Sequence, residues 1–338
     1  MYADRDKGAE NRKKNAAAMV DTFYDLVTDF YENGWGQSFH FAPRGRFETF
    51  RESIVRHEHY IAAKLDLNEN DYVLDVGCGI GGPMRNIAQF SSAKICGITI
   101  NEFCFNNRIL TIKKRYQVKR GTEITRKAGL EKLCESRVMN FLDMKFNDNT
   151  FDKAFAVEAT CHAGNREDVF SQVFRVLKPG GLFASYEWVL TDKYDDENSK
   201  HKKARQQVEK GNALPQIITA NRAVEAFKNV GFGKQKKFKK KVLSAVDVHK
   251  YATDNGQLPW YGTLEAKCSV ENLPQSYIAT VVTHTLCSVM EKIGMAPKGT
   301  TRAHEILLEG RDGLVASGQL GIFTPMFLII GRKPSKKT

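Results

Sequence analysis

The stretch Tyr72-Val-Leu-Asp-Val-Gly-Cys-Gly-Ile-Gly-Gly82 joins a short, mostly apolar run to a cluster of glycines. The apolar run predicts a buried β-strand, and the residues from about 83 to 90 predict a helix. Gly77, Gly79 and Gly81 sit where the strand gives way to the helix. Glycines allow the backbone to turn tightly there and to approach a ligand without a side chain in the way. The stretch therefore predicts a ligand-binding turn.

Strand signals alternate with helical signals along the next hundred residues. We expect further strands at about 94–100, 137–141, 151–157 and 182–187. The turn Lys178-Pro-Gly-Gly181 lies directly before the last of these. Strands that alternate with helices imply a mostly parallel sheet with helices on both faces. The fold class is therefore α/β and Rossmann-like. An apolar run at about 322–330 predicts one antiparallel strand, and we expect seven strands in all.

The flanking regions predict three parts of the chain. Residues 1–65 predict a helical and aromatic cap, with an amphipathic helix at 15–31, an aromatic loop and a second amphipathic stretch at 48–65. Residues 66–190 predict the Rossmann-like core. Residues 191–338 begin with a long polar insertion at 191–211 and are expected to complete the sheet. Within that last part we expect three helices, at about 222–230, 276–293 and 303–317.

The composition is that of an ordinary soluble globular protein, with 42% hydrophobic and 27% charged residues among 338. No run approaches the roughly 18 apolar residues of a membrane span, and the polar residues 1–14 do not match a signal peptide. The seven cysteines form no C-x-x-C pair, which indicates reduced thiols in a cytoplasmic protein. His57-Glu-His59 lacks the spacing of a zinc helix, so we expect no metal.

The charge is strongly basic, because 51 Lys and Arg residues exceed 39 Asp and Glu residues by 12. Residues 193–250 hold 15 basic and 6 acidic side chains, a net of +9. Such a surface attracts an anionic partner. The Lys-rich segment 234–241, with Phe232 and Phe238, is typical of an exposed sheet-edge strand in which lysines discourage mispairing. Contact with anionic lipid headgroups is a second interpretation.

The glycine turn differs from the G-x-G-x-x-G pattern of dinucleotide folds, because it reads D-V-G-C-G-I-G-G with Asp75 still inside the strand. It resembles the first motif of class I S-adenosylmethionine-dependent methyltransferases. The resemblance implies that this loop holds the amino-acid end of the cofactor. The residues it assigns to the cofactor are Asp75, Gly77, Cys78, Gly79, Gly81 and, beyond the loop, Glu158. The alternative is a turn that binds no cofactor.

Two further strand ends fit the same resemblance. The second strand ends at Thr99, 22 residues after Gly77, near the distance expected for a group that reaches a ribose hydroxyl. Such enzymes often carry a carboxylate after this strand, so Asn101 or Glu102 must supply the contact, or it is weaker here. Asn140 and Phe141 occupy the place where the resemblance implies a contact with the adenine amino group.

Four motifs, in family order, resemble sterol 24-C-methyltransferases. They are Tyr31-Glu-Asn-Gly-Trp-Gly-Gln-Ser-Phe-His-Phe41, Val157-Glu-Ala-Thr-Cys-His-Ala163, Tyr186-Glu-Trp188 with Thr191-Asp192, and Gly321-Ile-Phe-Thr-Pro-Met-Phe327. The similarity covers about residues 15–335. The chain departs from the family at Gly211-Asn-Ala-Leu-Pro215, where G-D-G-I-P is usual, and at Asn140, where Asp is frequent. These departures affect the substrate preference more than the reaction class.

The residue types in these motifs suit methyl transfer to an isolated alkene, a reaction that makes a carbocation. Aromatic faces and pre-placed carboxylates stabilise a positive centre in a dry pocket. The carboxylates are Glu32, Glu158, Glu187 and Glu209. The expected sterol-binding side chains are Tyr24, Trp35, Phe39, Tyr186, Trp188 and Phe323, with Tyr31 as a further aromatic face of the catalytic group.

The resemblance implies methylation at carbon 24, a cation at carbon 25, a hydride shift and loss of a proton to a base. The candidate bases are Glu32, His40, Glu158, His162 and Glu209. Glu158 and His162 come first, because they follow the fourth strand, at the edge where open α/β sheets bind ligands. Glu32 comes next. His40 has an alternative as a hydrogen-bonded buried histidine.

Other functions stay open at this point. The acceptor could be a prenylquinone, a phospholipid headgroup or an unsaturated fatty acid, or the chain could bind a sterol and the cofactor without turnover. An RNA methyltransferase is disfavoured, because the aromatic motif has no use in reading bases, and we expect no nucleic-acid partner. The resemblance implies a sterol substrate and peripheral contact with a membrane such as the endoplasmic reticulum. It leaves open an assembly of several copies.

Overall fold

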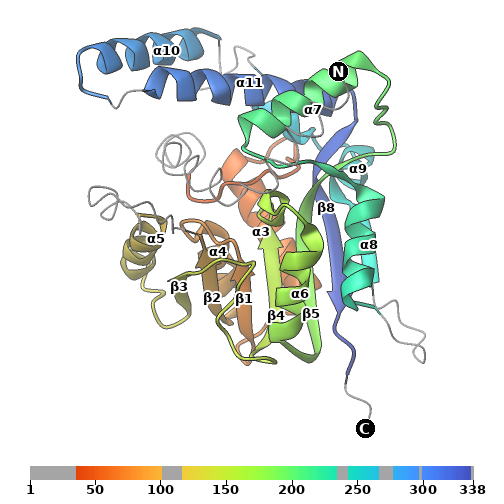
Figure 1. The fold of residues 1–338 in the computed structure, drawn as a ribbon. Coiled ribbons are helices and arrows are strands. Elements are labelled where there is room, and N and C mark those ends of the chain that lie inside the picture. Colours follow the sequence, from red (N-terminus) through yellow and green to blue (C-terminus); the bar gives the residue numbers. More distant parts are fainter. Residues whose placement is uncertain (1–35, 101–115, 234–242, 266–276, 297–298, 336–338) are drawn as a thin grey trace.

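A computed structural model describes residues 36–100, 116–233, 243–265, 277–296 and 299–335. Figure 1 shows a central sheet with helices on both faces and a layer of helices beyond one end of the strands. The predicted helix at 15–31 and the Lys-rich segment at 234–241, apart from its flanking Phe232, lie outside the described residues.

Eight strands form the sheet in the described part of the chain, and their order is β3-β2-β1-β4-β5-β8-β7 with β6 beside β5. Their bounds are β1 Tyr72–Val76, β2 Lys94–Thr99, β3 Cys134–Val138, β4 Phe151–Val157, β5 Leu177–Leu190, β6 Ile218–Thr219, β7 Leu243–Asp247 and β8 Phe323–Arg332. The strands β1 to β5 pair in parallel, whereas β8 runs antiparallel to both β5 and β7. The expected parallel sheet with one antiparallel strand is therefore confirmed.

Helices cover both faces of the sheet. The α-helices are α3 Phe50–Lys64, α4 Gly82–Ser91, α5 Tyr116–Lys127, α6 Arg166–Val176, α7 Ser199–Gly211, α8 Ala220–Val230, α9 Val248–Asp254, α10 Tyr277–Lys292 and α11 Thr300–Gln319, and the short 3₁₀ helices are η2 Thr160–His162 and η3 Trp260–Thr263. Among the described helices, none is long and apolar enough to cross a membrane.

Alternation along β1 divides the apolar core into two layers. Val73 belongs to a cluster with Ile61 of α3 and Ile87 of α4. Its neighbour Leu74 belongs to a second cluster with Phe170 of α6 and Phe227 of α8. Because successive side chains of a strand point to opposite faces, one apolar run supports helices on both sides of the sheet.

Three expectations need correction. The third strand begins and ends three residues earlier than predicted, because Cys134–Val138 is the segment in register with Ile95–Thr99. The polar stretch expected as an insertion contains a regular helix, α7, whose buried Ala204 and Val208 were hidden among charged neighbours. The sheet has eight strands where seven were expected, because Ile218 and Thr219 add a two-residue strand beside β5.

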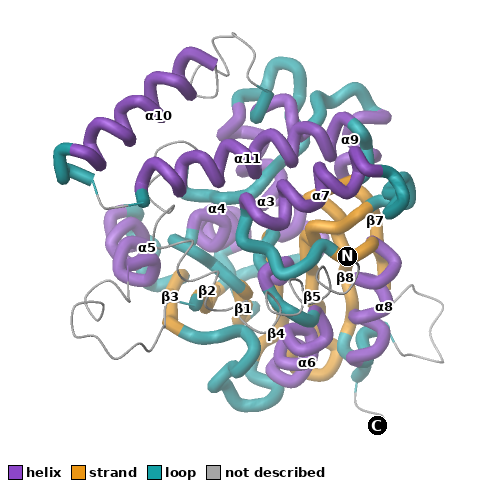
Figure 2. The backbone as a smooth tube through the Cα atoms, turned by 45° about the horizontal axis from the view of Figure 1, so that its top comes forward, coloured by secondary structure: helices purple, strands orange, loops and turns teal. Residues whose placement is uncertain are grey.

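The order of the strands creates a crevice at their carboxyl ends. From β1 the chain first builds β2 and β3 on one side and later places β4 and β5 on the other. Ligands of open α/β sheets bind at such a reversal point. The helix α7 follows the carboxyl end of β5, and α11 precedes the antiparallel β8, so both helices lie beyond this edge, as Figure 2 shows.

Candidate active site

The glycine turn after β1 has the backbone that its sequence predicted. Gly77, Gly79 and Gly81 have φ values of 89°, 52° and 79°, in the left-handed region that favours glycine. A Cβ atom added to Gly77 would lie 2.4 Å from Cβ of Ala159, so the turn packs directly against the chain after β4. At Gly79 an added Cβ would have no protein atom within 4 Å, because this part of the turn faces a pocket.

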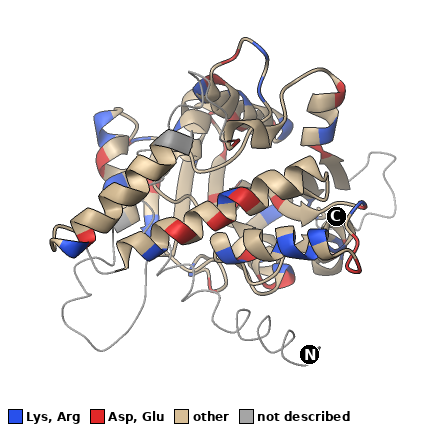
Figure 3. Ribbon diagram, turned by 90° about the horizontal axis from the view of Figure 1, so that it is seen from above, with Lys and Arg blue, Asp and Glu red and all other residues tan. Residues whose placement is uncertain are grey.

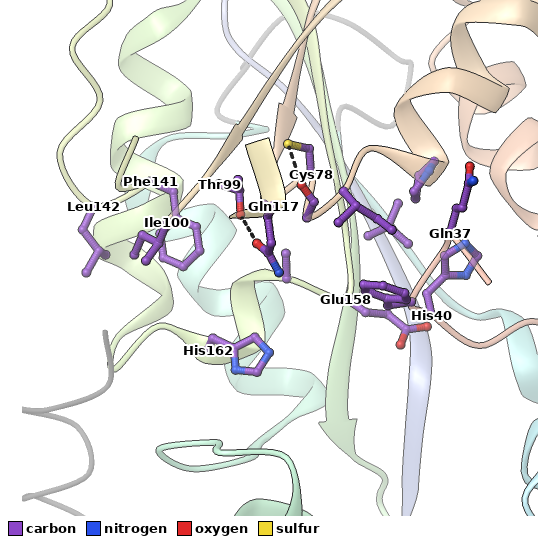
Figure 4. A pocket seen from close by; sticks show the side chains of 17 residues that line it. Gln37, His40, Cys78, Thr99, Ile100, Gln117, Phe141, Leu142, Glu158 and His162 are labelled. Atoms are coloured by element: carbon purple, nitrogen blue, oxygen red, sulfur yellow. Dashed lines mark hydrogen bonds between the residues drawn. The ribbon is translucent and has the colours of Figure 1, made fainter. Parts of the chain in front are cut away.

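This pocket lies at the carboxyl ends of β1, β2 and β4, with an empty volume of about 940 Å³ that includes its open mouth. Figure 4 shows side chains from separate segments converging on it. The predicted residues that line it are Phe39, His40, Gly77, Cys78, Gly79, Thr99, Phe141, Glu158 and His162. The structure thus brings six of the ten predicted cofactor residues together with the predicted catalytic side chains His40, Glu158 and His162, whereas Asp75, Gly81 and Asn140 are not part of this lining.

Asp75 lies beneath the glycine turn with 2% of its surface exposed. Its Oδ2 atom has no hydrogen-bond partner among the described residues. Burial raises the pKa of its carboxyl group well above the usual value, and the nearby charge of Glu58 adds to this rise. A buried polar atom without a partner is costly. The carboxyl group under a glycine turn therefore suits a ligand that brings hydrogen-bond donors or positive charge.

Of the residues predicted at the two strand ends beside the turn, Thr99 and Phe141 line the pocket, whereas Asn140 is not part of the lining. The Thr99 hydroxyl donates a 2.9 Å hydrogen bond to the side-chain carbonyl of Gln117, which also lines the pocket from α5. The side-chain carbonyl of Asn140 accepts a 2.8 Å bond from the Leu142 N–H, so Asn140 shapes the loop while Phe141 and Leu142 line the pocket. Asn101 lies outside the described residues.

Glu158 is the buried acid of the pocket, with 6% of its surface exposed and a φ of 54°. Its Oε1 atom accepts a 2.9 Å bond from the N–H of Phe41, and its Oε2 atom accepts a 2.8 Å bond from Nε1 of Trp188. Burial raises the pKa of Glu158 to about 7, although His40 and the two hydrogen bonds oppose the rise. A carboxyl group with this pKa can exchange a proton near neutral pH.

His40 lies near two acids that favour its charged form. Its Nε2 atom is 3.0 Å from Oε1 of Glu58, and its Nδ1 atom is 2.9 Å from the carbonyl oxygen of Phe41. Because both partners accept hydrogen bonds, both ring nitrogens donate. Burial acts to lower the pKa of His40, but the bond and charge of Glu58 and the charge of Glu158 outweigh it and raise the pKa.

Glu58 is a site residue that the sequence interpretation missed. It is fully buried and also accepts hydrogen bonds from the Ser38 hydroxyl at 2.7 Å and from the Asn86 amide at 2.6 Å. Its neighbour His57 stacks on Tyr186 with ring centroids 4.0 Å apart. The run His57-Glu-His59 could have indicated this residue, because three consecutive polar residues of an amphipathic helix cannot all face solvent. The sequence interpretation considered the run only as a zinc motif.

His162 lines the pocket from η2 and is held neutral. Burial, followed by the positive charge of Arg166, lowers its pKa to about 4. The Nε atom of Arg166 is 3.2 Å from Oε2 of the buried Glu187, which also accepts bonds from the hydroxyls of Thr160 and Ser185. This buried network fixes the short helix that carries His162. The negative charge of Glu187 is paired with the guanidinium group of Arg166.

Two predicted sterol-binding aromatics, Trp188 and Phe323, belong to a buried cluster behind Glu158. The ring of Trp188 is 6.1 Å from that of Phe41 and 5.4 Å from that of Phe323. Trp260 completes the cluster, 4.9 Å from Phe41 and 5.8 Å from Phe323. Trp260 was missed, because it lies far along the sequence in a loop without a recognised motif. These rings give the carboxyl group of Glu158 an apolar surround.

The remaining predicted side chains lie elsewhere. Glu209 is buried in α7 outside the pocket lining, where its Oε1 atom binds Nε of Arg205 at 2.8 Å and the N–H of Ile217 at 3.0 Å. The predicted residues that lie outside the described part of the chain are Tyr24, Tyr31, Glu32 and Trp35.

Comparisons with known proteins agree with this geometry. Residues 74–185 match the model of a methyltransferase domain, and residues 271–335 match the model of the sterol methyltransferase C-terminal region. The chain is 40% identical to the sterol 24-C-methyltransferase of Saccharomyces cerevisiae, over 97% of this chain and 82% of that protein. The chain belongs to the sterol 24-C-methyltransferase family. The resemblance found in the four sequence motifs is thereby confirmed.

A second sterol methyltransferase relative is the cycloartenol-C-24-methyltransferase 1 of Oryza sativa, 40% identical over 96% of this chain and 88% of that protein. Solved structures share the fold at low sequence identity. The [4+2]-cyclase SpnF has a TM-score of 0.63 and 19% identity, covering 94% of this chain and 95% of its own. A geranyl diphosphate methyltransferase has a TM-score of 0.61 and 15% identity, covering 94% and 99%. These two show the class I methyltransferase fold alone.

Proposed function

We propose that this enzyme transfers a methyl group from S-adenosylmethionine to carbon 24 of a sterol whose side chain has a double bond there, as a step of sterol biosynthesis. The observation that carries the proposal is the buried carboxyl group of Glu158 in the pocket formed by the glycine turn. The protein is also 40% identical to proteins named for C-24 methylation.

The residues of the pocket fit the cofactor. The turn from Gly77 to Gly81 offers backbone without side chains, and Asp75 offers a buried oxygen without a partner among the described residues. Gln117 and Phe141 line the far side, where an amide and a ring suit a nucleoside. When bound, S-adenosylmethionine supplies an electrophilic methyl group. The protein's part is to orient it and to exclude water.

Addition of a methyl group to the side-chain alkene leaves a positive charge at carbon 25 of the sterol. Fixed negative charge in a dry site stabilises such a cation, since the low local dielectric strengthens the attraction. Glu158 is buried and held by two N–H donors, so it needs little rearrangement to act in this way. Phe39 lines the same pocket and offers an aromatic face. A hydride shift then moves the charge next to the new methyl group.

The last step removes a proton, and the protonation states favour two of the five candidate bases. Glu158, with a pKa of about 7, is partly ionised at neutral pH, and His162, with a pKa of about 4, is neutral. Both can accept a proton. His40 already donates from both nitrogens, so we assign it the role of fixing the Phe41 backbone, whose N–H binds Glu158, and of balancing the charge of Glu158. Glu209 is engaged by Arg205 outside the pocket lining.

The substrate also implies a place of action. Sterols reside in membranes, so we propose peripheral contact with a membrane, such as that of the endoplasmic reticulum. The basic excess of 12 charges supports attraction to an anionic surface.

The test is incubation of the purified protein with methyl-labelled S-adenosylmethionine and sterols with and without the carbon-24 double bond, followed by mass spectrometry. We expect a labelled 24-methyl or 24-methylene product from the unsaturated sterols alone. Label in a quinone, a fatty acid or a phospholipid headgroup would show that this molecule, and not a sterol, is the methyl acceptor. Tight binding of both ligands without a labelled product would contradict enzymatic turnover.

A further inference from the structure

The helix α10 has two distinct faces, and one of them holds α11. The Thr280 hydroxyl accepts a 3.1 Å bond from Nη1 of Arg311, and the ring of His284 lies beside that of His304. At the end of α10, Glu291 accepts bonds from the N–H groups of Gly299 and Thr301 at 2.6 and 2.8 Å, which caps the start of α11. These residues recur at helical spacing, so one face of α10 is fixed against its neighbour.

The opposite face of α10 is an apolar row exposed to solvent. It consists of Val281, Val282, Leu286 and Val289 of the helix and of Ile293 directly after its last residue, with exposures of 45%, 60%, 55%, 48% and 61%. Met295, just past the helix, adds a further side chain at 71%. From Ala279 to Met290 the helix carries no acidic, lysine or arginine side chain. An exposed apolar row of this length without charges marks an interaction surface.

Basic side chains lie in the same layer. Looking down on that layer, Figure 3 shows α10 without charge over most of its length and the blue lysines of α7 on the other side of α11. Lys200, Lys203 and Lys210 of α7 are exposed, and Lys210 binds Glu309 of α11 at 2.6 Å. The layer thus combines an apolar helix with a basic one, beyond the carboxyl ends of the strands that form the pocket.

We propose that this layer docks on a lipid bilayer that contains anionic headgroups. The apolar row of α10 enters the boundary between headgroups and acyl chains, and the α7 lysines contact the anionic headgroups. An uncharged apolar row suits acyl chains, and the lysines supply the charge complementarity. The inference rests on the proposed function, because it names the surface through which the enzyme would meet a membrane-embedded acceptor, and it places that surface at the edge of the sheet that carries the pocket.

The first test is flotation with vesicles of phosphatidylcholine that contain phosphatidylserine. The variant Val282→Asp with Leu286→Asp places two charges in the apolar row at positions that do not hold α11, so it should fold normally. We expect its vesicle affinity to fall by at least about tenfold. The matched control is Phe47→Asp with Phe90→Asp, which changes the same net charge at two other exposed apolar positions. Its affinity should stay within about twofold of the unmodified protein. Equal loss in both variants would overturn the proposal.

The second test addresses the lysines. Lys200→Gln with Lys203→Gln should lower binding to the phosphatidylserine vesicles by about tenfold or more and leave binding to pure phosphatidylcholine nearly unchanged. Unchanged binding to both kinds of vesicle would contradict the proposal.

Light scattering in solution tests whether a second copy of the protein, and not a bilayer, covers the apolar row. If the unmodified protein were a dimer that Val282→Asp with Leu286→Asp converted to a monomer, the row would be a subunit interface and the proposal would be wrong.

Methylation rates measured with two sources of sterol distinguish this inference from the proposed function. With sterol supplied from cyclodextrin, Val282→Asp with Leu286→Asp should methylate at the normal rate, whereas with sterol embedded in vesicles its rate should fall about tenfold. Equal rates with both sources would contradict docking through α10. If the unmodified protein methylated no sterol from either source, the proposed function would fail, whereas the flotation result would still decide whether the surface binds lipid.

Discussion

The indole Nε1 of Trp188 donates a 2.8 Å hydrogen bond to Oε2 of Glu158, and both side chains are buried. Trp188 comes from β5 and Glu158 follows β4, so the bond spans two neighbouring strands at their carboxyl ends. The N–H of Phe41 binds the other carboxylate oxygen from the segment before α3. Two other parts of the chain therefore hold this carboxyl group in position.

Replacing Trp188 by Phe should shift the pH dependence of methyl transfer. The indole bond stabilises the ionised form of Glu158, so its loss raises the pKa of this group above about 7. If the ionised form acts in catalysis, the acidic limb of the rate profile should move up by about one pH unit. Single-turnover rates across pH measure this. The control is Trp260→Phe in the same cluster, which should leave the limb in place because Nε1 of Trp260 has no hydrogen-bond partner among the described residues. A shift of the same size in both variants would count against the assignment.

Glu158→Gln should remove a stabilising charge and a candidate base while keeping the shape of the side chain. We expect turnover to fall by about 10²–10⁴-fold, the range typical of general acid–base groups. Calorimetry with S-adenosylmethionine should show cofactor affinity within a few-fold of normal, because the glycine turn is unchanged. Near-normal turnover with normal cofactor binding would exclude a catalytic role for Glu158.

Glu58→Gln should destabilise the fold in a pH-dependent way. The raised pKa of His40 contributes stability below its unfolded value of about 6.5, and this contribution is lost as the pH rises through the raised folded value. Without the carboxylate of Glu58, the variant should lose about 1–3 kcal/mol at acidic pH and less at alkaline pH. Urea unfolding at several pH values measures the difference. The partly exposed ion pair of Glu48 with Arg56 supplies a control, Glu48→Gln, which should cost under about 1 kcal/mol. A loss that did not depend on pH would contradict the link to His40.

Gly79→Ala should test how closely the cofactor approaches the turn. The added Cβ meets no protein atom within 4 Å, so the folded state pays only for the positive φ, roughly 1 kcal/mol. Gly129→Ala is the matched control, since Gly129 also has a positive φ, of 68°, and open space around it. Both variants should lose similar stability, but Gly79→Ala alone should weaken S-adenosylmethionine binding, by about tenfold or more. Equal affinity in the two variants would mean that the cofactor does not contact this residue.

The sheet could be predicted from the sequence wherever local patterns agreed with the tertiary structure. The β1 run and the glycines of the turn predicted the crevice, because each glycine stands where the backbone needs a positive φ. The error at β3 arose because Cys134–Val138 includes the polar Glu135 and Arg137, which pair with each other at a sheet edge. Burial patterns are weak on an edge strand, so Met139 to Phe141 looked more like a strand.

The sequence predicted individual side chains of the site but not the contacts that link them to distant residues. Glu158 and His162 follow a strand end, and this position identified them. No local pattern indicated that Glu58, a hundred residues earlier, would bind His40, or that Trp260, a hundred residues later, would pack on Phe41. Such contacts depend on how loops return across the sheet, and nothing in the spacing of residues encodes that path.

The position of β8 has a consequence for how the chain folds during synthesis. This strand, the only antiparallel one among those described, lies between β5 and β7, so it is an interior strand built from some of the last described residues. Until the ribosome has released residues 323–332, β5 has an open side and β7 has no partner. Exposed strand edges invite wrong pairing. The nascent protein therefore depends on late completion of its sheet, and a cell that makes it slowly must keep that edge covered in the meantime.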